Sequence, residues 1–319
     1  MRFAVMLEPQ QGYSYADIRT VAKHVEAVGF EAFFRSDHYS SFGEGPELAT
    51  TDAWTTLAAL ARDTSTIRLG TLVSPVTFRH PGQLAKVVTT VDEISGGRVE
   101  VGLGAGWFEI EHRRYGFPMP PIPTRFDMLE DSLAILETLW GPDGQTFEGR
   151  VWGLTDTAAQ PKPLQRPRPP IILGGRAGAR GSRLAATYAA EYNVCEIPTD
   201  EARQRFAAVD EACTAIGRDP ATLTRSLLIP AVLGRDRTDV DRRIAEGLGE
   251  SRRAMGADDI ERERGRTWLV GGLAEATDLL LEYGASGVQR TIFQLQAGRD
   301  LAHIDLLAEL SRQPSLAGA

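Results

Sequence analysis

Hydrophobic positions along the chain follow two alternating patterns. Short apolar runs are followed by longer segments in which apolar residues recur every three or four positions. The first pattern is typical of buried strands, and the second is typical of amphipathic helices. The apolar runs predict eight strands, at residues 3–7, 32–35, 67–73, 99–103, 170–173, 193–197, 227–233 and 288–294.

The helical pattern fills the intervals between these strands. Asp52 is a candidate N-cap, Pro81 suits the first turn of a helix, and Gly29 suits a helix end. The predicted helices are 15–28, 52–62, 81–94, 125–140, 180–190, 201–216, 237–266, 274–283 and 303–312.

Eight strands that are each followed by a helix predict an α/β fold, a single (β/α)8 TIM barrel. A doubly wound open sheet is the alternative. Two proline-rich stretches, 118–123 and 161–170, bracket a predicted helix and a predicted hairpin near 147–152. They predict a rim insertion between strands four and five. A second, helical insertion is expected after strand seven, and residues 1–319 are expected to form one domain.

Composition narrows the classes of partner. The 319 residues carry a formal net charge of −8, which disfavours a broad surface for nucleic acid or for an anionic membrane. Cys195 and Cys213 are too few for a disulfide framework, and both are expected to be buried thiols. No apolar run approaches the length of a membrane span. We therefore expect a cytoplasmic protein with a small-molecule substrate.

Acid–base chemistry is indicated directly after the second predicted strand, where Asp37 and His38 stand side by side. Residues that follow the carboxyl ends of barrel strands gather around one mouth, where such barrels place their active sites. An imidazole there can transfer a proton near neutral pH. We expect His38 to donate or accept a proton, with Asp37 either orienting the imidazole or contacting a cofactor ring. The alternative is an ordinary polar loop.

Glycine-rich stretches follow the fourth and fifth predicted strands. The first reads Gly-Leu-Gly-Ala-Gly-Trp over residues 102–107, and the second runs over residues 174–183. Glycine allows unusual dihedrals and a close approach of a flat ligand. The second stretch also enters a predicted helix, whose free N–H groups attract an anion. Together they predict a planar cofactor with a phosphate, to which three side chains can add hydrogen bonds: Arg176, Arg180 and Arg183.

Other motifs of catalysis are missing from the sequence. Trp107 stands where the dinucleotide-binding motif would have its third glycine. No two histidines have the i, i+4 spacing of a zinc helix, and no G-x-S-x-G elbow occurs. A metal site and an esterase are therefore not expected. Aromatic residues near the strand ends can either wall a flat pocket or pack the rim: Trp54, Trp107, Phe108 and Phe117.

These residues, in this order, resemble the luciferase-like monooxygenase superfamily, and within it the oxidoreductases that depend on the deazaflavin coenzyme F420. The resemblance begins with Phe34-Arg-Ser-Asp-His38 and spans nearly the whole chain. The further matching segments are 69–74, 97–107, 111–112, 125–130, 171–175 and 269–271.

The resemblance implies a TIM barrel with an isoalloxazine-like ring at its mouth, lying against a bulge in strand three. Members often have a non-prolyl cis peptide at this bulge, which would fall here between Leu72 and Val73. Asp37 and His38 match the family's active-site pair. The positions that match cofactor-binding residues are Leu72, Val73, Ala105, Gly106, Gly174, Gly175, Arg176, Gly178, Ala179 and Arg180.

The resulting expectation is hydride transfer between reduced coenzyme F420 and a small organic substrate. An FMN-dependent two-component monooxygenase is the alternative, and a catalytically silent flavin-binding protein is a third possibility. Some sugar-oxidising members place a glutamate where this chain has Trp107, which argues against oxidation of a sugar phosphate. The resemblance to this family also implies a homodimer.

Overall fold

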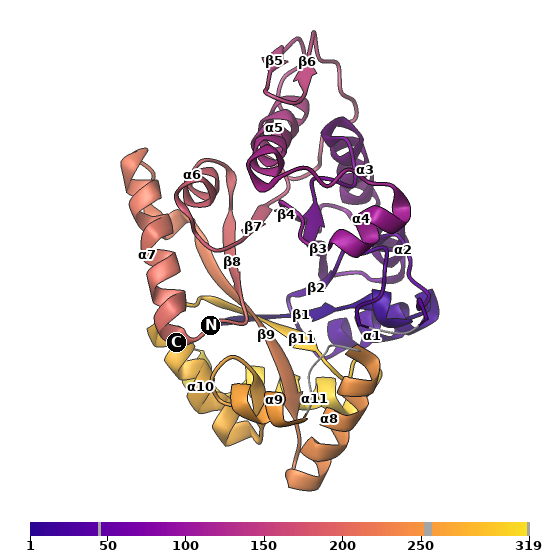
Figure 1. Cartoon of the computed structure of the whole chain (residues 1–319), viewed down its shortest axis with the longest axis vertical. Coiled ribbons are helices and arrows are strands. Elements are labelled where there is room, and N and C mark those ends of the chain that lie inside the picture. The colour runs from indigo at the N-terminus through magenta and orange to yellow at the C-terminus, as the bar shows by residue number, and fades with distance from the viewer. Residues whose placement is uncertain (44–45, 252–256, 318–319) are drawn as a thin grey trace.

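The chain folds as a closed barrel of eight parallel strands surrounded by helices, as Figure 1 shows for a computed structural model that describes residues 1–43, 46–251 and 257–317. The barrel closes because β8 pairs with β9, and β9 pairs with β11, which pairs with β1. This confirms the predicted TIM barrel and excludes the open sheet. The barrel strands are β1 (Arg2–Leu7), β2 (Ala32–Arg35), β3 (Arg68–Pro75), β4 (Val99–Gly104), β7 (Ile171–Gly174), β8 (Glu191–Cys195), β9 (Thr224–Leu233) and β11 (Arg290–Leu295).

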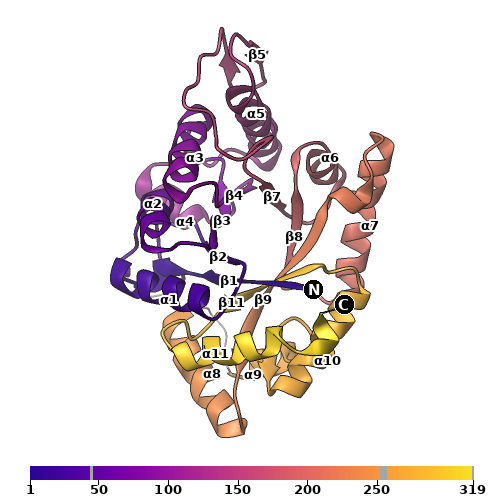
Figure 2. The same ribbon diagram turned by 180° about the vertical axis from the view of Figure 1, so that it is seen from behind.

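Helices cover the outside of this barrel, as the two opposite views in Figures 1 and 2 show. They are α1 (Tyr15–Ala27), α2 (Ala53–Asp63), α3 (Pro81–Ser95), α4 (Glu109–Tyr115), α5 (Ile122–Trp140), α6 (Ala179–Tyr188), α7 (Thr199–Ala215), α8 (Arg237–Ser251), α9 (Ala257–Glu263), α10 (Leu273–Ala285) and α11 (Leu301–Ser311). The expected N-cap is confirmed, because the Asp52 side chain accepts a hydrogen bond from the backbone N–H of Thr55. No helix in the described ranges is both long and apolar enough to cross a bilayer.

Two groups of elements lie outside the simple strand–helix repeat. Between β4 and β7 the chain forms α4, α5 and a hairpin of β5 (Phe147–Glu148) and β6 (Gly153–Leu154), which projects beyond α5 in Figure 1. After β9 it forms α8, α9 and the short strand β10 (Leu269–Gly271), which pairs with the end of β9. The helical region predicted over 237–266 contains α8 and α9, and residues 252–256 lie outside the described ranges.

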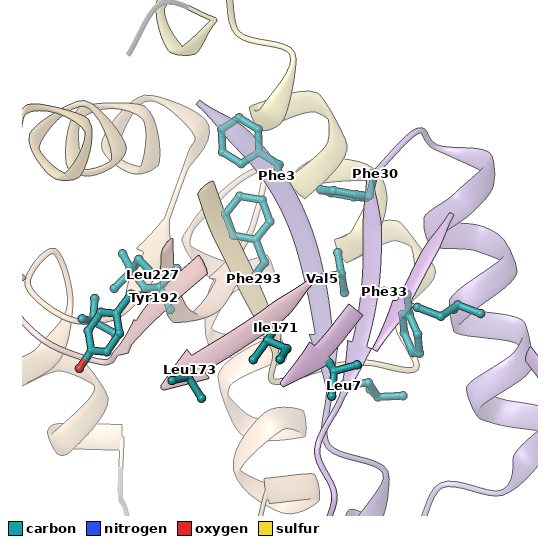
Figure 3. Packing of buried hydrophobic residues seen from close by; sticks show 14 of the residues in the cluster. Phe3, Val5, Leu7, Phe30, Phe33, Ile171, Leu173, Tyr192, Leu227 and Phe293 are labelled. Carbon is teal, nitrogen blue, oxygen red and sulfur yellow. The ribbon is translucent and has the colours of Figure 1, made fainter. Parts of the chain in front are cut away.

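Alternating side chains divide the barrel into an outer and an inner layer, because successive residues of a strand face opposite sides. On β1, Phe3, Val5 and Leu7 belong to the large cluster that packs against the helices, part of which Figure 3 shows. The residues between them, Ala4 and Met6, belong to the smaller cluster inside the barrel. The other members of this inner cluster are Ala32, Phe34, Leu72, Ile172, Leu228 and Ile292.

A buried ion cluster lies at the opposite end of the barrel from the mouth, near the start of the strands. Arg290, at the first position of β11, contacts Glu100 of β4 at 2.8 Å and Glu191 of β8 at 2.7 Å. It also contacts Glu31 at 2.5 Å. The Arg290 side chain is only 2% exposed, and its guanidinium lies 5.1 Å from the centre of the Phe34 ring. The cluster therefore fills the barrel below the inner apolar layer with paired charges.

The sixth strand and one cysteine differ from the sequence-based expectations. The sixth strand begins at Glu191 and ends at Cys195, two residues before its predicted limits at both ends. Glu191 interrupts the apolar pattern, yet it is buried because Arg290 pairs with it. Cys213 is buried as expected, but Cys195, at the last position of this strand, is exposed.

His303 makes the stability of the fold depend on pH. It is fully buried on α11, where its Nε2 accepts a hydrogen bond from the backbone N–H of Leu233. Burial, reinforced by the nearby Arg243 charge, lowers the pKa of His303 to about 3. At pH values between the ordinary pKa of a histidine and this lowered pKa, the unfolded chain therefore binds a proton more readily than the folded chain does. The free energy of unfolding falls as pH falls through that range.

We expect the variant His303→Gln to lose this part of the pH dependence, because glutamine keeps an acceptor for Leu233 but does not titrate. Between pH 7 and pH 4.5 the free energy of unfolding of the native chain should fall more steeply, by roughly 1–3 kcal/mol. Urea unfolding at both pH values measures this difference. Parallel pH dependences in the two proteins would contradict the assignment.

Candidate functional site

The barrel mouth contains an irregular segment of β3. The pairing of β3 with β4 shifts register between Thr71 and Ser74, which forms a bulge, and the peptide bond between Leu72 and Val73 is cis. Both features were expected from the family resemblance, and both are confirmed. Leu72 is buried in the inner cluster, and Val73 packs against the edge of that cluster. The bulge therefore presents Val73 at the top of the inner layer.

Glycines on two neighbouring strands make room for Val73. A Cβ atom added to Gly104 would lie 2.7 Å from Val73 Cγ2, and one added to Gly102 would lie 3.0 Å from Val73 Cγ1 and 2.1 Å from the Thr71 oxygen. A Cβ added to Gly174 of β7 would lie 3.8 Å from Val73 Cγ1. Gly102 and Gly104 have no positive φ, so the strand requires them for this close packing. Our expectation that their dihedrals are unusual is wrong.

Gly106 is the glycine of the first stretch that needs an unusual dihedral. Its φ is +80°, in the region that side chains disfavour. A Cβ there would also lie 3.2 Å from Thr77 Oγ1, and the Gly106 carbonyl accepts a hydrogen bond from Arg125 of α5. Ala105, beside it, is partly buried. These contacts turn the chain away from β4 towards Trp107 and α4.

Asp37 holds the bulge, and it is not the partner of His38. Its carboxylate is buried, accepts a hydrogen bond from Ser74 Oγ at 2.6 Å, and forms an ion pair with Arg79 at 2.5 Å. Ser74 in turn accepts a hydrogen bond from Trp54 Nε1 at 3.0 Å. The expectation that Asp37 orients the imidazole is therefore wrong, because Ser74 and Arg79 occupy its oxygens. Trp54 is buried in this network and walls no open pocket.

The charges around Arg79 neutralise one another. Burial alone would lower the pKa of Arg79, but the Asp37 carboxylate raises it. Asp52 also pairs with Arg79, at 2.5 Å. Burial alone would raise the pKa of Asp52. The hydrogen bond from Thr55 and the Arg79 charge outweigh burial and lower this pKa to about 2. Arg79 is therefore held between two carboxylates and offers no free cation to a ligand.

Glu111 is the carboxylate that orients His38. Nδ1–H of His38 donates to Glu111 Oε1 at 2.8 Å, and the backbone N–H of Tyr39 donates to Glu111 Oε2 at 2.8 Å. Glu111 is 1% exposed and the His38 side chain is 11% exposed. Since the carboxylate requires the proton on Nδ1, Nε2 is the nitrogen left for acid–base chemistry. No group in the described part of the chain forms a hydrogen bond with Nε2.

Helix α4, which carries Glu111, is fixed to the barrel by His112. Nδ1–H of His112 donates to the Phe108 carbonyl at 2.8 Å, so Nε2 of His112 accepts a hydrogen bond from Thr77 Oγ1 at 2.6 Å. Phe78 packs between the rings of His112 and Phe117, at 5.1 Å and 4.9 Å. The sequence analysis did not predict this short helix. Its attachment to the loop after β3 keeps the Glu111 carboxylate in reach of His38.

Three aromatic rings surround the His38 imidazole. The ring centres of Phe42, Trp107 and Phe108 lie 4.9, 5.7 and 5.9 Å from that of His38, with interplanar angles of 72–83°. We refer to these four residues as the His38 cluster. Trp107 is 64% exposed although it is the largest side chain of the group. Of the aromatic residues considered from the sequence, Trp107 and Phe108 thus lie beside the candidate acid–base residue.

The second glycine-rich stretch forms a tight turn that leads into α6. Ala177 has a φ of +50°, and its N–H donates to the hydroxyl of Tyr192 on β8 at 2.6 Å. Gly178 is the N-cap of α6 and supplies no side chain to bond the first N–H groups. Gly175 is exposed, and Ala179 begins the helix. The start of α6 therefore keeps backbone donors that can bind an anion.

The three arginines of this stretch are not equivalent. Arg180 pairs with Asp127 at 2.6 Å and with Glu130 at 2.8 Å, and Arg183 pairs with Glu130 at 2.7 Å. The expectation that all three are available to a phosphate is therefore wrong for Arg180 and Arg183, because α5 supplies both with carboxylates. Arg176 is exposed, and no described residue forms an ion pair with it.

The comparisons with known proteins agree on a family. The profile of the luciferase-like monooxygenases matches residues 1–300. An F420-dependent glucose-6-phosphate dehydrogenase of Microbacterium testaceum is 31% identical over 224 residues, which cover 68% of this chain and 59% of that protein. An FMNH2-dependent dimethylsulfone monooxygenase of Pseudomonas putida is 28% identical over 257 residues, which cover 77% and 69% of the two chains. The chain thus spans about three fifths of the length of the first relative.

A solved structure supports the same architecture. An F420-dependent secondary alcohol dehydrogenase, in complex with an F420-acetone adduct, superposes with a TM-score of 0.83. The alignment covers 99% of this chain and 98% of that one, at 20% sequence identity. At this identity the likeness establishes the fold.

Proposed function

The chain belongs to the luciferase-like monooxygenase family, and from this premise we propose that it is an oxidoreductase that transfers a hydride between reduced coenzyme F420 and a small organic substrate. The reaction would take place at the carboxyl-terminal mouth of the barrel. The observation that carries the proposal is the imidazole of His38, held by Glu111 with Nε2 free, at the same mouth as the bulge of β3.

The names of the relatives favour F420 and keep FMN as the second candidate. The F420-dependent dehydrogenase of M. testaceum is the more similar of the two relatives in sequence identity, at 31% against 28%. The FMNH2-dependent monooxygenase aligns over the longer segment. Arginine outnumbers lysine strongly in the chain, which is typical of a GC-rich genome, where F420 is common.

The residues at the mouth fit a planar cofactor with an anionic tail. The exposed start of α6, with its uncapped N–H groups and the unpaired Arg176, suits a phosphate. Gly174, Gly175, Gly178 and Ala179 leave the backbone of this turn open to it. Leu72 and Val73 at the bulge, with Ala105 and Gly106 at the end of β4, would border the ring. When bound, reduced F420 supplies the hydride.

His38 would balance the hydride with a proton. With Nδ1–H committed to Glu111, Nε2 donates a proton to a substrate that gains a hydride, or accepts one in the reverse direction. Asp37 acts on the bulge through Ser74 and Arg79 instead of on the imidazole. We therefore assign Asp37 a positioning role. Its contact with the cofactor ring stays a prediction.

The cofactor can be identified by fluorescence titration of the purified protein with F420 and with FMN. We expect F420 to bind more tightly, and Arg176→Gln to weaken that binding by about tenfold, because one charge-assisted hydrogen bond to the phosphate is lost. Arg183→Gln is the matched control, since Glu130 already neutralises Arg183. It should leave the dissociation constant nearly unchanged.

Other outcomes would contradict this proposal. Binding of FMN alone, with oxygen consumed during turnover, would identify an FMN-dependent monooxygenase. Binding without turnover of any substrate would favour a silent flavin-binding protein. Equal weakening by the two arginine substitutions would contradict the assignment of the phosphate to Arg176. The homodimer that the family implies and the cytoplasmic location expected from the sequence are part of the proposal, and size-exclusion chromatography with light scattering tests the former.

A further inference from the structure

The substrate side of the mouth has an apolar, aromatic chemistry. We infer that the substrate is an uncharged molecule with a flat aromatic or alicyclic body, which packs against Trp107 while its reacting polar atom meets His38. This inference rests on the proposed function, because it takes His38 as the acid–base residue. It adds the chemical class of the substrate and assigns Trp107 as a specificity-determining residue.

The first argument is the position of the rings. A substrate atom that exchanges a proton with His38 Nε2 must come within hydrogen-bond distance of it. Three aromatic side chains, Phe42, Trp107 and Phe108, have ring centres within 6 Å of that of the imidazole. Any molecule that reaches Nε2 therefore lies against these rings. Trp107 is 64% exposed, so it has a large apolar area to bury against such a molecule.

Nearby cations already donate to carboxylates or to backbone carbonyls, which is a second reason to expect an uncharged substrate. Arg79 pairs with Asp37 and Asp52, as described above. Arg114 of α4 pairs with Glu47, and Arg125 donates to the carbonyls of Gly106 and Pro120. An anionic substrate would lose its hydration without gaining a counter-ion from these groups, and the negative faces of the rings would repel it.

Arg113 is a further exposed cation on α4. Arg113 has no ion pair with any described residue. It stands two positions after Glu111 on a helix, which places it roughly 200° around the helix axis from Glu111. Since Glu111 faces His38, Arg113 points away from the His38 cluster.

The third argument concerns a cationic substrate, since aromatic rings also bind cations. Glu111 is the carboxylate beside the cluster, but it is 1% exposed and both its oxygens accept hydrogen bonds from His38 and Tyr39. It is therefore not available as a counter-ion. A protonated His38, which the proposed reaction requires in the reducing direction, would repel a positive charge as well. An uncharged molecule remains the occupant that fits.

Binding of matched probes tests the inference. We propose saturation-transfer NMR with acetophenone, 4-acetylbenzoate and phenyltrimethylammonium, each measured with the protein and F420 present. Acetophenone should bind at least about tenfold more tightly than the anion or the cation. Trp107→Ala should weaken the binding of acetophenone by about tenfold, because the largest exposed apolar surface is removed. Ile216→Ala, which changes another exposed apolar residue on the surface, is the control and should have no effect.

The outcomes separate this inference from the proposed function. Equal or tighter binding of 4-acetylbenzoate or of phenyltrimethylammonium overturns the uncharged class, and an unaltered affinity in Trp107→Ala overturns the role of the indole. In both cases the F420 titration can still succeed. Failure of F420 to bind, with the preference for acetophenone intact in its absence, would contradict the cofactor assignment and leave the inference about the substrate standing.

Discussion

Replacement of His38 by alanine should lower turnover by about 10²–10⁴-fold and leave the affinity for the cofactor nearly unchanged. The reason is geometric. The imidazole is tied to Glu111 through Nδ1, so Nε2 is the nitrogen left for proton transfer, and its loss removes the proton donor or acceptor. The cofactor contacts that we propose come from the β3 bulge, the end of β4 and the start of α6, none of which includes His38. Steady-state kinetics and the fluorescence titration measure the two quantities separately.

Glu111 provides the second half of this test. A residue that acts only by orienting His38 should matter only while His38 is present. We therefore expect Glu111→Gln to lower kcat, and the double variant His38→Ala/Glu111→Gln to be no slower than His38→Ala alone. His24→Ala, which removes a histidine paired with Asp305 at the protein surface, is the control. Unchanged turnover in His38→Ala, or fully additive losses in the double variant, would contradict these roles.

Local sequence patterns predicted most of the barrel because each strand carries its own apolar signal. β2 has the predicted limits, 32–35, and β4 extends the predicted 99–103 by one residue. The prediction is less accurate where polar residues lie inside the barrel. β9 begins at Thr224, three residues before its predicted start, and β8 begins at Glu191. Such residues are buried because of partners on other strands, and a local window of sequence does not contain those partners.

The same distinction explains the candidate site. His38 and the two glycine-rich stretches are local signals, and the sequence predicts all three as parts of the site. The pairing of His38 with Glu111 joins residues 73 positions apart, and that of Arg180 with Asp127 joins residues 53 positions apart. Neither pairing has a local signature. Residues 111–112 match the family resemblance, but only the attachment of α4 to the barrel shows that Glu111 reaches the imidazole.

The buried ion cluster at the far end of the barrel should be essential for stability. We expect Arg290→Met to lower the free energy of unfolding by about 3–5 kcal/mol at pH 7, because Glu191 and Glu100 lose their shared buried cation. Burial raises the pKa of Glu191 even with Arg290 present, although the Arg290 charge opposes the shift. Without the Arg290 charge, the folded state must bind a proton at Glu191. The deficit should therefore shrink as pH falls towards 5, where protonation costs less.

A second substitution distinguishes a charge effect from a packing effect. If the unpaired carboxylate causes the loss, Arg290→Met/Glu191→Gln should recover part of it, since a neutral amide replaces the buried charge. Arg225→Met removes a half-exposed ion pair with Asp210 and should cost at most about 1 kcal/mol. Urea unfolding at pH 7 and pH 5 measures all three variants. A double variant no more stable than Arg290→Met would show that the lost arginine packing, and not the uncompensated charge of Glu191, dominates the stability of this end of the barrel.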